Sequence, residues 1–334
     1  MRNEEWGMRP SFRGAIVCGL LLVLVACAGG GAAPSPSPSS TPAPTPDWLA
    51  VNDFLYQLQR ARLERIGETA YDLVVVQMGA PGGSRERIEA LKHSPGGDKI
   101  VLCYMSIGQA TNLAHYWQPE WSKEPPAWLD ETDGVWAGDY WVRYWDPDWQ
   151  AIIYGSPDSY LDRVLALGFD GVYMDRVDAY EYYEEQGRET AAREMADFVI
   201  GLTQYARERR PGFGIFPQNA EELGTRFPDY LQTVTGVGVE DLYYGYPRDH
   251  EPSPPDWTAA REAVLDQWVA ASKLVLTIDY TGIPAQIDDA YTRAQARGYV
   301  PFVTVRSLGL LMINEGHGAQ ERDRKMSEYR KNFD

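Results

Sequence analysis

The chain has 334 residues, 44% of them hydrophobic, and its 48 acidic side chains outnumber 31 Lys and Arg to give a formal charge of −17. So acidic a chain is a poor partner for nucleic acid or an anionic membrane surface, whereas it suits a cationic partner or simply high solubility. Three cysteines, two of them in the N-terminal segment, exclude a disulfide framework.

The N-terminal segment resembles the signal peptide of a bacterial lipoprotein. Arg9 and Arg13 precede the apolar run 15–26, and a small-residue cleavage site ends in Cys27. The run is shorter than the about 20 residues of a membrane-spanning helix, so any anchor would be a lipid. We expect residues 1–26 to be removed and Cys27 to be lipidated at an extracytoplasmic membrane surface. An ordinary secretory signal cleaved nearby is the alternative.

Residues 27–47 are predicted to be a tether. From 28 to 46 the chain contains only Gly, Ala, Pro, Ser and Thr, with no charge and no aromatic ring. Such a segment cannot bury a core and stays extended or flexible. Residues 48–334 contain no second Pro-rich boundary, and we assign them to one domain.

After the tether, short apolar runs alternate with amphipathic stretches, the pattern of parallel strands covered by helices. Some runs, such as Val74-Val75-Val76, are apolar at every position, as expected of strands buried on both faces. We predict strands at 53–59, 71–77, 99–106, 171–175, 212–219, 237–240, 273–280 and 300–307.

Helices are predicted between these strands. Pro254-Pro255 marks a helix start, and Gly168 and Gly298 mark helix ends. One apolar stripe at helical spacing is formed by Met195, Phe198, Val199 and Leu202. Eight β-then-α units within residues 48–334 predict a single (β/α)8 TIM barrel of the α/β class. An open doubly wound sheet is the alternative, although no Gly-rich dinucleotide fingerprint follows the first strand.

Acidic side chains end two of the predicted strands. Asp175 ends the fourth and Glu240 the sixth, with Asn219 at the end of the fifth. Reactive groups of such barrels lie at the C-terminal ends of the strands, so both carboxyl groups would face one mouth. A glycosidase needs two carboxyl groups, one to protonate the leaving oxygen and one to attack or to activate water. A single strand-end Asp is more often a cap, but this pair predicts a catalytic site.

The connection after the third predicted strand, about 107–155, is long and rich in Trp and Tyr. Long connections in compact domains are usually functional, and aromatic faces offer platforms on which sugar rings stack. We expect two or three of these rings to contact a polysaccharide and the others to pack the connection onto the domain.

Other chemistries receive little support from the sequence. The four histidines are scattered, without the spacing of metal ligands, and no nucleophile elbow, phosphate-binding loop or Cys-His pair is present. We therefore expect neither a metal nor a cofactor. Cys103, inside an apolar run, is interpreted as a small buried residue.

Five short segments together resemble glycoside hydrolase family 114, described as endo-α-1,4-polygalactosaminidases. They are YDLVVV at 71–76, CYMSIG at 103–108, GFDGVYMD at 168–175, PQN at 217–219 and VEDLYY at 239–244. The resemblance extends over about residues 48–312. It implies a retaining endo-hydrolase of partly de-N-acetylated galactosaminogalactan, with Asp175 as nucleophile and Glu240 as acid/base.

Two positions depart from the family's pattern. Gln77 and Gln109 stand where the family often has Asp and Glu, which would weaken attraction for a cationic sugar. The side chains expected to bind substrate are Gln77, Tyr104, Ser106, Gln109, Trp141, Tyr173, Asp178, Asn219, Asp279 and Tyr280. Two other functions stay open: a polysaccharide-binding lipoprotein without turnover, and an α-glycosidase acting on neutral sugars.

Overall fold

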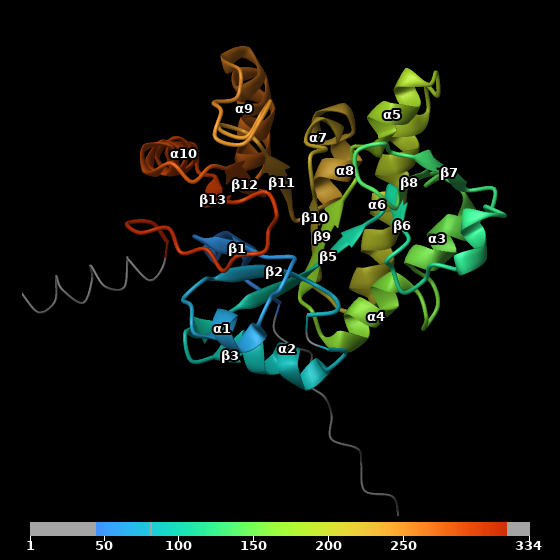
Figure 1. Ribbon diagram of the computed structural model, residues 1–334, viewed down its shortest axis with the longest axis horizontal. Helices are drawn as coiled ribbons and strands as arrows, with labels where there is room; N and C mark the ends of the chain where they lie inside the picture. The colour runs from blue at the N-terminus through green and yellow to red at the C-terminus, as the bar shows by residue number, and fades with distance from the viewer. Residues whose placement is uncertain (1–44, 81, 319–334) are drawn as a thin grey trace, which may run out of the picture. The chain divides into compact units, whose positions relative to one another are not determined.

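The computed structural model describes residues 45–80 and 82–318 (Figure 1). The predicted signal peptide, Cys27 and nearly all of the tether lie outside the described residues. Eight parallel strands correspond one to one with those predicted. They are β1 (Phe54–Tyr56), β2 (Leu73–Gln77), β5 (Ile100–Ser106), β9 (Gly171–Asp175), β10 (Gly214–Pro217), β11 (Gly236–Glu240), β12 (Leu274–Tyr280) and β13 (Val300–Thr304).

The parallel strands form two sheets, one in the order β1-β2-β5-β9-β10 and one in the order β11-β12-β13. A parallel bridge between Gln218 and Gly238 lies between the sheets, just after β10. In β5 and β9, Ser106 is in register with Asp175, and in β2 and β5, Gln77 is in register with Tyr104. Strand order along the sheet therefore follows chain order, as successive β-then-α units require.

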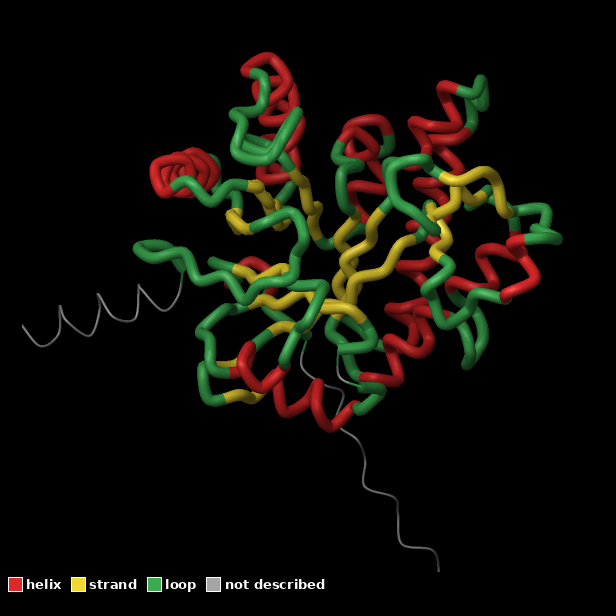
Figure 2. Tube along the Cα trace, viewed as in Figure 1, coloured by secondary structure: helices red, strands yellow, loops and turns green. Residues whose placement is uncertain are grey.

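Helices lie outside the strands in Figure 2. They are α1 (Leu63–Gly67), α2 (Arg85–Lys92), α3 (Pro147–Ile153), α4 (Tyr160–Leu167), α5 (Ala179–Glu185), α6 (Ala191–Arg209), α7 (Glu222–Arg226), α8 (Pro228–Thr233), α9 (Pro255–Ala270) and α10 (Pro284–Ala296), with 3-10 turns at Trp48–Ala50 and Pro119–Ser122. The predicted boundaries at Pro255, Gly168 and Gly298 are confirmed. Both glycines have left-handed backbone, φ 86° and 78°, which lets the chain leave the helix without strain.

The connection after β5 is not an irregular loop. It contains an antiparallel sheet of β6 (Gln109–Thr111), β8 (Asp139–Val142) and β7 (Leu129–Thr132), and a separate pair, β3 (His93–Ser94) with β4 (Gly97–Asp98), precedes β5. Within it, Trp128, Tyr144 and Trp149 are buried, and Trp149 Nε1 donates 2.9 Å to the Ile107 carbonyl. Several of its rings therefore hold the connection against the strands.

Apolar side chains of the strands form the core. Val74, Val75 and Val76 have no exposed surface, nor does Cys103, which is buried as expected. The predicted α6 stripe is buried as well. Close packing reaches the backbone at β11, where a methyl group added to Gly238 would stand 1.9 Å from the Tyr173 hydroxyl. Glycine is therefore required there for Tyr173 to fit between the strands.

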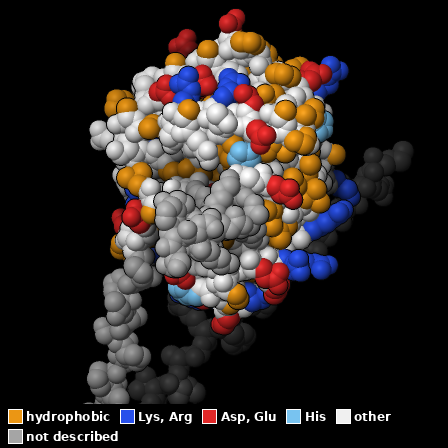
Figure 3. Space-filling view, turned by 90° about the vertical axis from the view of Figure 1, so that its left-hand side faces the viewer, with side chains coloured by type: hydrophobic (Ala, Val, Ile, Leu, Met, Phe, Trp, Pro, Cys, Tyr) orange, Lys and Arg blue, Asp and Glu red, His pale blue; other side chains and the backbone are white. Residues whose placement is uncertain are grey.

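The surface of the domain mixes charges of both signs. Figure 3 shows one side, on which acidic and basic side chains are interspersed with apolar ones. The acidic excess of the chain is not gathered into one patch on this face. No helix in the described ranges is both long and apolar enough to cross a membrane.

Candidate active site

Two of the parallel strands end in a carboxylate, as predicted. Asp175 is the last residue of β9, Glu240 is the last residue of β11, and Gln218 directly follows β10 between them. Because the strands run parallel, their C-terminal ends meet at one edge, where the reactive groups of such folds are found.

The amide of Gln218 joins the two carboxylates. Its Nε2 donates to Asp175 Oδ1 at 3.2 Å and to Glu240 Oε2 at 2.6 Å. These two oxygens are therefore no farther apart than the two distances added together, about 5.8 Å. The Tyr56 hydroxyl donates to Gln218 Oε1 at 3.2 Å, which fixes the amide with its nitrogen toward the carboxylates.

Asp175 is surrounded by donors. Tyr104 donates its hydroxyl to Oδ2 at 2.5 Å, the Arg176 backbone N–H donates to Oδ1 at 2.7 Å, and Gln218 supplies the third bond. Burial, and next the nearby Asp175 charge, raise the pKa of Tyr104 well above its usual value, so that hydroxyl keeps its proton. The carboxylate is thus held in one orientation with both oxygens engaged.

Glu240 has a different environment. Asn219 Nδ2 donates to Oε2 at 3.0 Å, and the Tyr280 hydroxyl donates to Oε1. Burial, followed by the negative charge of Asp175, raises the pKa of Glu240 to about 7, although the hydrogen bonds from Tyr280 and Asn219 oppose this. Glu240 therefore carries a proton below neutral pH, as a general acid must.

An arginine whose side chain is 12% exposed supports the Glu240 backbone. Arg261, on α9, donates to the Glu240 carbonyl at 2.7 Å and to Asn219 Oδ1 at 3.3 Å, and pairs with Glu221 at 2.5 Å. Asn219 Oδ1 in turn accepts from the Glu240 N–H at 2.9 Å. The end of β11 is therefore fixed from two sides.

The residues that follow the three strand ends have unusual backbone. Arg176, Asn219 and Asp241 have φ values of 60°, 54° and 58°, in the left-handed region that side chains other than Gly rarely adopt. Each lies directly after a residue of the cluster, Asp175, Gln218 or Glu240. Such strain persists only where surrounding contacts enforce it, and it occurs often at functional sites.

Several expected substrate-binding residues lie beside the carboxylates. Gln77, exposed, ends β2 next to Tyr104, and the Ser106 hydroxyl donates to the Gln109 carbonyl at 3.0 Å. Gln109 itself is buried and donates from Nε2 to Asp133 Oδ2 at 3.1 Å.

Trp141 belongs to an aromatic pair at the same edge. Its ring stacks on Tyr182 with centroids 4.3 Å apart and planes 3° apart, and the Arg176 guanidinium lies 4.7 Å from the ring centroid. Both rings are partly exposed. The Tyr182 ring and the Arg176 guanidinium therefore both pack against the Trp141 ring.

Four of the expected contact residues are buried: Asp279 and Tyr173 have no exposed surface, and Tyr280 and Gln109 are 1% and 3% exposed. Direct contact of these four with a substrate stays a prediction. Asp279 Oδ1 accepts from the backbone N–H groups of Tyr243 and Tyr244 at 2.7 and 2.8 Å, which positions the chain after β11. Strand alternation decides this, because Tyr280, the next residue, turns the opposite way and reaches Glu240.

Asp178 follows β9 by three residues and lies partly exposed beside Arg176, 4.0 Å from its Nε. Burial raises its pKa to about 7, with Arg176 opposing this shift, and its Oδ1 has no hydrogen-bond partner in the described part of the chain. That oxygen is itself buried and faces Arg176.

Replacing Asp279 with Asn tests whether this buried carboxyl group acts as a structural hydrogen-bond acceptor. Burial raises the pKa of Asp279 to about 7. The folded state therefore retains a proton that the unfolded chain loses near pH 4, so its contribution to stability falls as pH rises from about 4 to 7. Asn keeps the Oδ1 acceptor without a charge, so Asp279→Asn should stabilise the fold by about 1–3 kcal/mol at pH 8 and by little near pH 4.

Thermal melts followed by circular dichroism at pH 4.5, 6 and 8 measure this difference. Asp158→Asn, at a side chain that is 96% exposed, is the matched control and should show no such trend. An Asp279→Asn variant equally destabilised at every pH would contradict the interpretation.

Sequence reasoning missed three supporting residues. Gln218 was visible as part of the PQN segment but gave no sign of bridging two carboxylates. Tyr56, on the first strand, and Arg261, on α9, are distant in sequence, and only the fold brings them to the site. Buried polar residues at strand ends were the one available signal.

The described residues contain no group of three or more His, Cys, Asp or Glu able to hold a metal ion.

The fold is similar to that of solved structures. The glycoside hydrolase domain of PelA from Pseudomonas aeruginosa is 20% identical with a TM-score of 0.63, covering 79% of this chain and 98% of that domain. A variant of the same domain gives a TM-score of 0.61 at 19% identity, with the same coverage. This chain therefore shares the fold of that domain.

The family follows from the sequence. The profile of glycoside hydrolase family GH114 matches residues 34–324, and the chain belongs to that family. Similar chains are an uncharacterized protein of Thermotoga maritima, 33% identical over 82% of this chain and 86% of that protein, and one of Deinococcus radiodurans, 38% identical over 77% and 80%. A protein of Methanocaldococcus jannaschii, also uncharacterized, is 36% identical over 74% of both chains.

Proposed function

We propose that this chain is a retaining, endo-acting hydrolase of an α-1,4-linked, galactosamine-containing polysaccharide. The observation that carries the proposal is the single amide nitrogen of Gln218 that bonds both Asp175 and Glu240. Retaining glycosidases hold their two carboxyl groups about 5 to 5.5 Å apart, whereas inverting ones leave about 6.5 to 9.5 Å for a water. The upper limit of about 5.8 Å between the nearest oxygens supports the shorter class.

The two carboxyl groups divide the chemistry. Asp175 attacks the anomeric carbon while Glu240 gives its proton to the leaving glycosidic oxygen, and a covalent glycosyl ester forms on Asp175. Glu240, now ionised, then takes a proton from a water whose oxygen attacks the same carbon, and Asp175 leaves as a carboxylate. The raised pKa of Glu240, about 7, suits both roles near neutral pH.

A cationic sugar finds acidic groups beside this pair. Asp133 accepts from Gln109 and lies 3.8 Å from Arg176, and the pKa of Asp139 is raised by burial first and by Asp133 next. These carboxyl groups belong to the same connection as Gln109, where the family often has Glu. They support an amino sugar as substrate.

A product screen tests the substrate class. Purified protein should release oligosaccharides from partly de-N-acetylated galactosaminogalactan, and far less from chitosan or a neutral α-galactan, as read by mass spectrometry of the products. Cleavage of neutral α-galactan alone would assign a neutral-sugar α-glycosidase. Binding of a polymer without any product would assign a polysaccharide-binding protein.

We also propose that the eight parallel strands close into a (β/α)8 barrel. Backbone N–H groups of Leu58 and Gln59, after β1, donate to the Leu308 carbonyl, after β13, at 2.9 and 3.0 Å. Together with the Gln218 to Gly238 bridge, these bonds support contact at both junctions between the two sheets.

We further propose that the protein is an extracytoplasmic lipoprotein held to a membrane surface through Cys27. Changing Cys27 to Ser should remove the lipid and move the protein to the aqueous phase of a detergent partition, while its melting temperature stays unchanged. Unaltered partitioning of the Cys27→Ser chain argues for ordinary secretion instead.

A further inference from the structure

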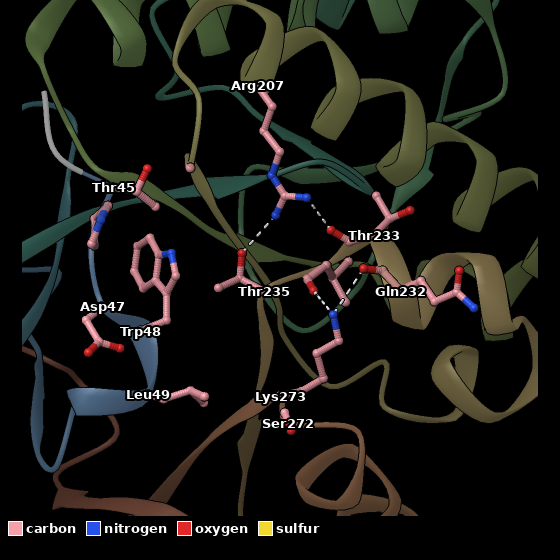
Figure 4. Close-up of a pocket in the computed structure, with 13 residues that line it drawn as sticks. Thr45, Asp47, Trp48, Leu49, Arg207, Gln232, Thr233, Thr235, Ser272 and Lys273 are labelled. Atoms are coloured by element: carbon pink, nitrogen blue, oxygen red, sulfur yellow. Dashed lines mark hydrogen bonds between the residues drawn. The ribbon is translucent and has the colours of Figure 1, made fainter. Parts of the chain in front are cut away.

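A cavity lies at the end of the strands opposite the carboxylate pair (Figure 4). Its volume is about 410 Å³, and it lies between the first described residues, the C-terminal ends of α6 and α8, and the residues that precede β10, β11 and β12. Asp175 and Glu240 end β9 and β11, so this cavity and the carboxylates lie at opposite ends of the strands. The lining includes Trp48, Arg207, Thr235 and Lys273.

One wall of the cavity is the segment that enters the domain. The Trp48 indole packs edge-on against Phe216, with centroids 5.3 Å apart, and a methyl group added to Gly214 would stand 2.4 Å from it. Because Gly214 has no side chain, the Trp48 indole can pack directly against its backbone. Residues 45–49 are held by this contact and shape the cavity.

Two cations face the cavity. Arg207, in the last turn of α6, donates to the Thr233 carbonyl at 2.7 Å and to Thr235 Oγ1 at 3.1 Å. Lys273, just before β12, donates to the carbonyls of Gln232 and Val234 at 3.1 and 2.6 Å. Three successive carbonyls at the end of α8 thus bring the guanidinium and the ammonium together, as Figure 4 shows.

These bonds leave donors unused. Arg207 also donates from Nε to the Phe213 carbonyl, so three of the five guanidinium N–H groups and two of the three ammonium N–H groups are engaged. Thr235 Oγ1 accepts from Arg207 and from the Ile215 N–H at 2.9 Å, and its own proton is free to donate. The cavity therefore presents donors from three side chains.

No described carboxylate neutralises this pair. In a chain of formal charge −17, neither Arg207 nor Lys273 forms an ion pair within residues 45–80 and 82–318. Asp47 contributes to the lining, but Figure 4 shows its side chain turned away from both cations. Burial, and then the charge of Arg207, lower the pKa of Lys273, while burial lowers that of Arg207. The α8 carbonyls offset only part of this charge, because a helix terminus carries about half an elementary charge.

We propose that this cavity binds a phosphate-type oxyanion, held by Arg207, Lys273 and Thr235. A tetrahedral anion accepts several hydrogen bonds at once, and its charge compensates both cations. The volume exceeds that of the bare ion, so a phosphate ester such as a lipid headgroup also fits. The cavity adjoins the point where the proposed tether joins the domain, which brings lipid phosphates within reach if Cys27 is lipidated.

Isothermal titration of the full-length Cys27→Ser chain with inorganic phosphate tests the site, with chloride at equal ionic strength as the blank. Lys273→Gln should weaken binding by about tenfold or more, because a charge-assisted contact is lost. Lys123→Gln, which removes an equal charge at an exposed position, is the matched control and should leave binding unchanged. The proposal is overturned if wild-type protein shows no saturable binding of phosphate below about 10 mM, a dissociation constant that corresponds to about 3 kcal/mol at the 1 M standard state. It is also overturned if Lys273→Gln and Lys123→Gln weaken binding equally.

Sedimentation with vesicles separates the two sources of phosphate. Greater retention on phosphatidylglycerol than on phosphatidylcholine vesicles, lost in Lys273→Gln, identifies a lipid headgroup as the ligand. Retention on neither lipid, together with binding of inorganic phosphate, identifies the free ion. If Lys273→Gln fails to fold, Lys273→Arg replaces it, and this variant should bind phosphate because it keeps the charge. In that case a crystal of the wild-type chain soaked in phosphate must also show density between Arg207 and Lys273 for the proposal to hold.

Discussion

Replacing Asp175 with Asn should lower kcat on polysaccharide by about 10⁴-fold or more, because no other group can form the glycosyl ester. Asn preserves the shape of the side chain, and Tyr104 and Gln218 can adjust to the amide. Binding should therefore survive while turnover is lost. The measurement is product release under saturating polymer, with binding followed by fluorescence polarisation of a labelled oligomer.

The control for Asp175→Asn is Asp158→Asn, an exposed carboxylate away from the strand ends, which should retain full activity. Full activity in Asp175→Asn would remove this residue from the mechanism, provided that both variants melt at the wild-type temperature.

Replacing Glu240 with Gln should lower kcat on polysaccharide by about 10²–10⁴-fold, the usual contribution of a general acid. Its effect should depend on the leaving group. An aryl glycoside whose leaving phenolate needs no proton should still form the glycosyl-enzyme rapidly, so a burst of phenol is expected, followed by slow hydrolysis. Asp175→Asn should give no burst with the same substrate.

The pH dependence identifies the same group. With wild-type enzyme, kcat/KM on polysaccharide should fall above about pH 7 as Glu240 loses its proton. In Glu240→Gln this fall should be absent. If kcat/KM of the variant still falls above about pH 7, the fall belongs to another carboxyl group with a raised pKa. Asp178 is the candidate beside the site.

The order of elements could be predicted because buried parallel strands leave a strong signature. Runs such as Val74-Val75-Val76 are apolar at every position, and Gly168 ends a helix where only a left-handed residue fits. The ends of strands β9 and β11 were also predictable, since Asp175 and Glu240 interrupt apolar runs. Strand limits therefore agree within a few residues.

The contacts between strands could not be predicted in the same way. Gln218 bridges the carboxylates because Tyr56, 162 residues earlier, fixes its amide. Asp279 and Tyr280 are both buried on opposite faces of β12, and only Tyr280 reaches Glu240. Strand register decides which side chain lies on which face, and neither residue type indicates it. The antiparallel sheet after β5 was hidden because its Trp and Tyr suggested a binding loop rather than strands.

The packing of Trp48 against Gly214 has a practical consequence for immobilising the enzyme. The chain enters the domain at the end of the strands opposite Asp175 and Glu240. If the protein is coupled to a bead through residues ahead of Trp48, the catalytic edge should point toward the bulk liquid rather than toward the support. Coupling at that end should therefore leave long, insoluble polymers accessible to the immobilised enzyme.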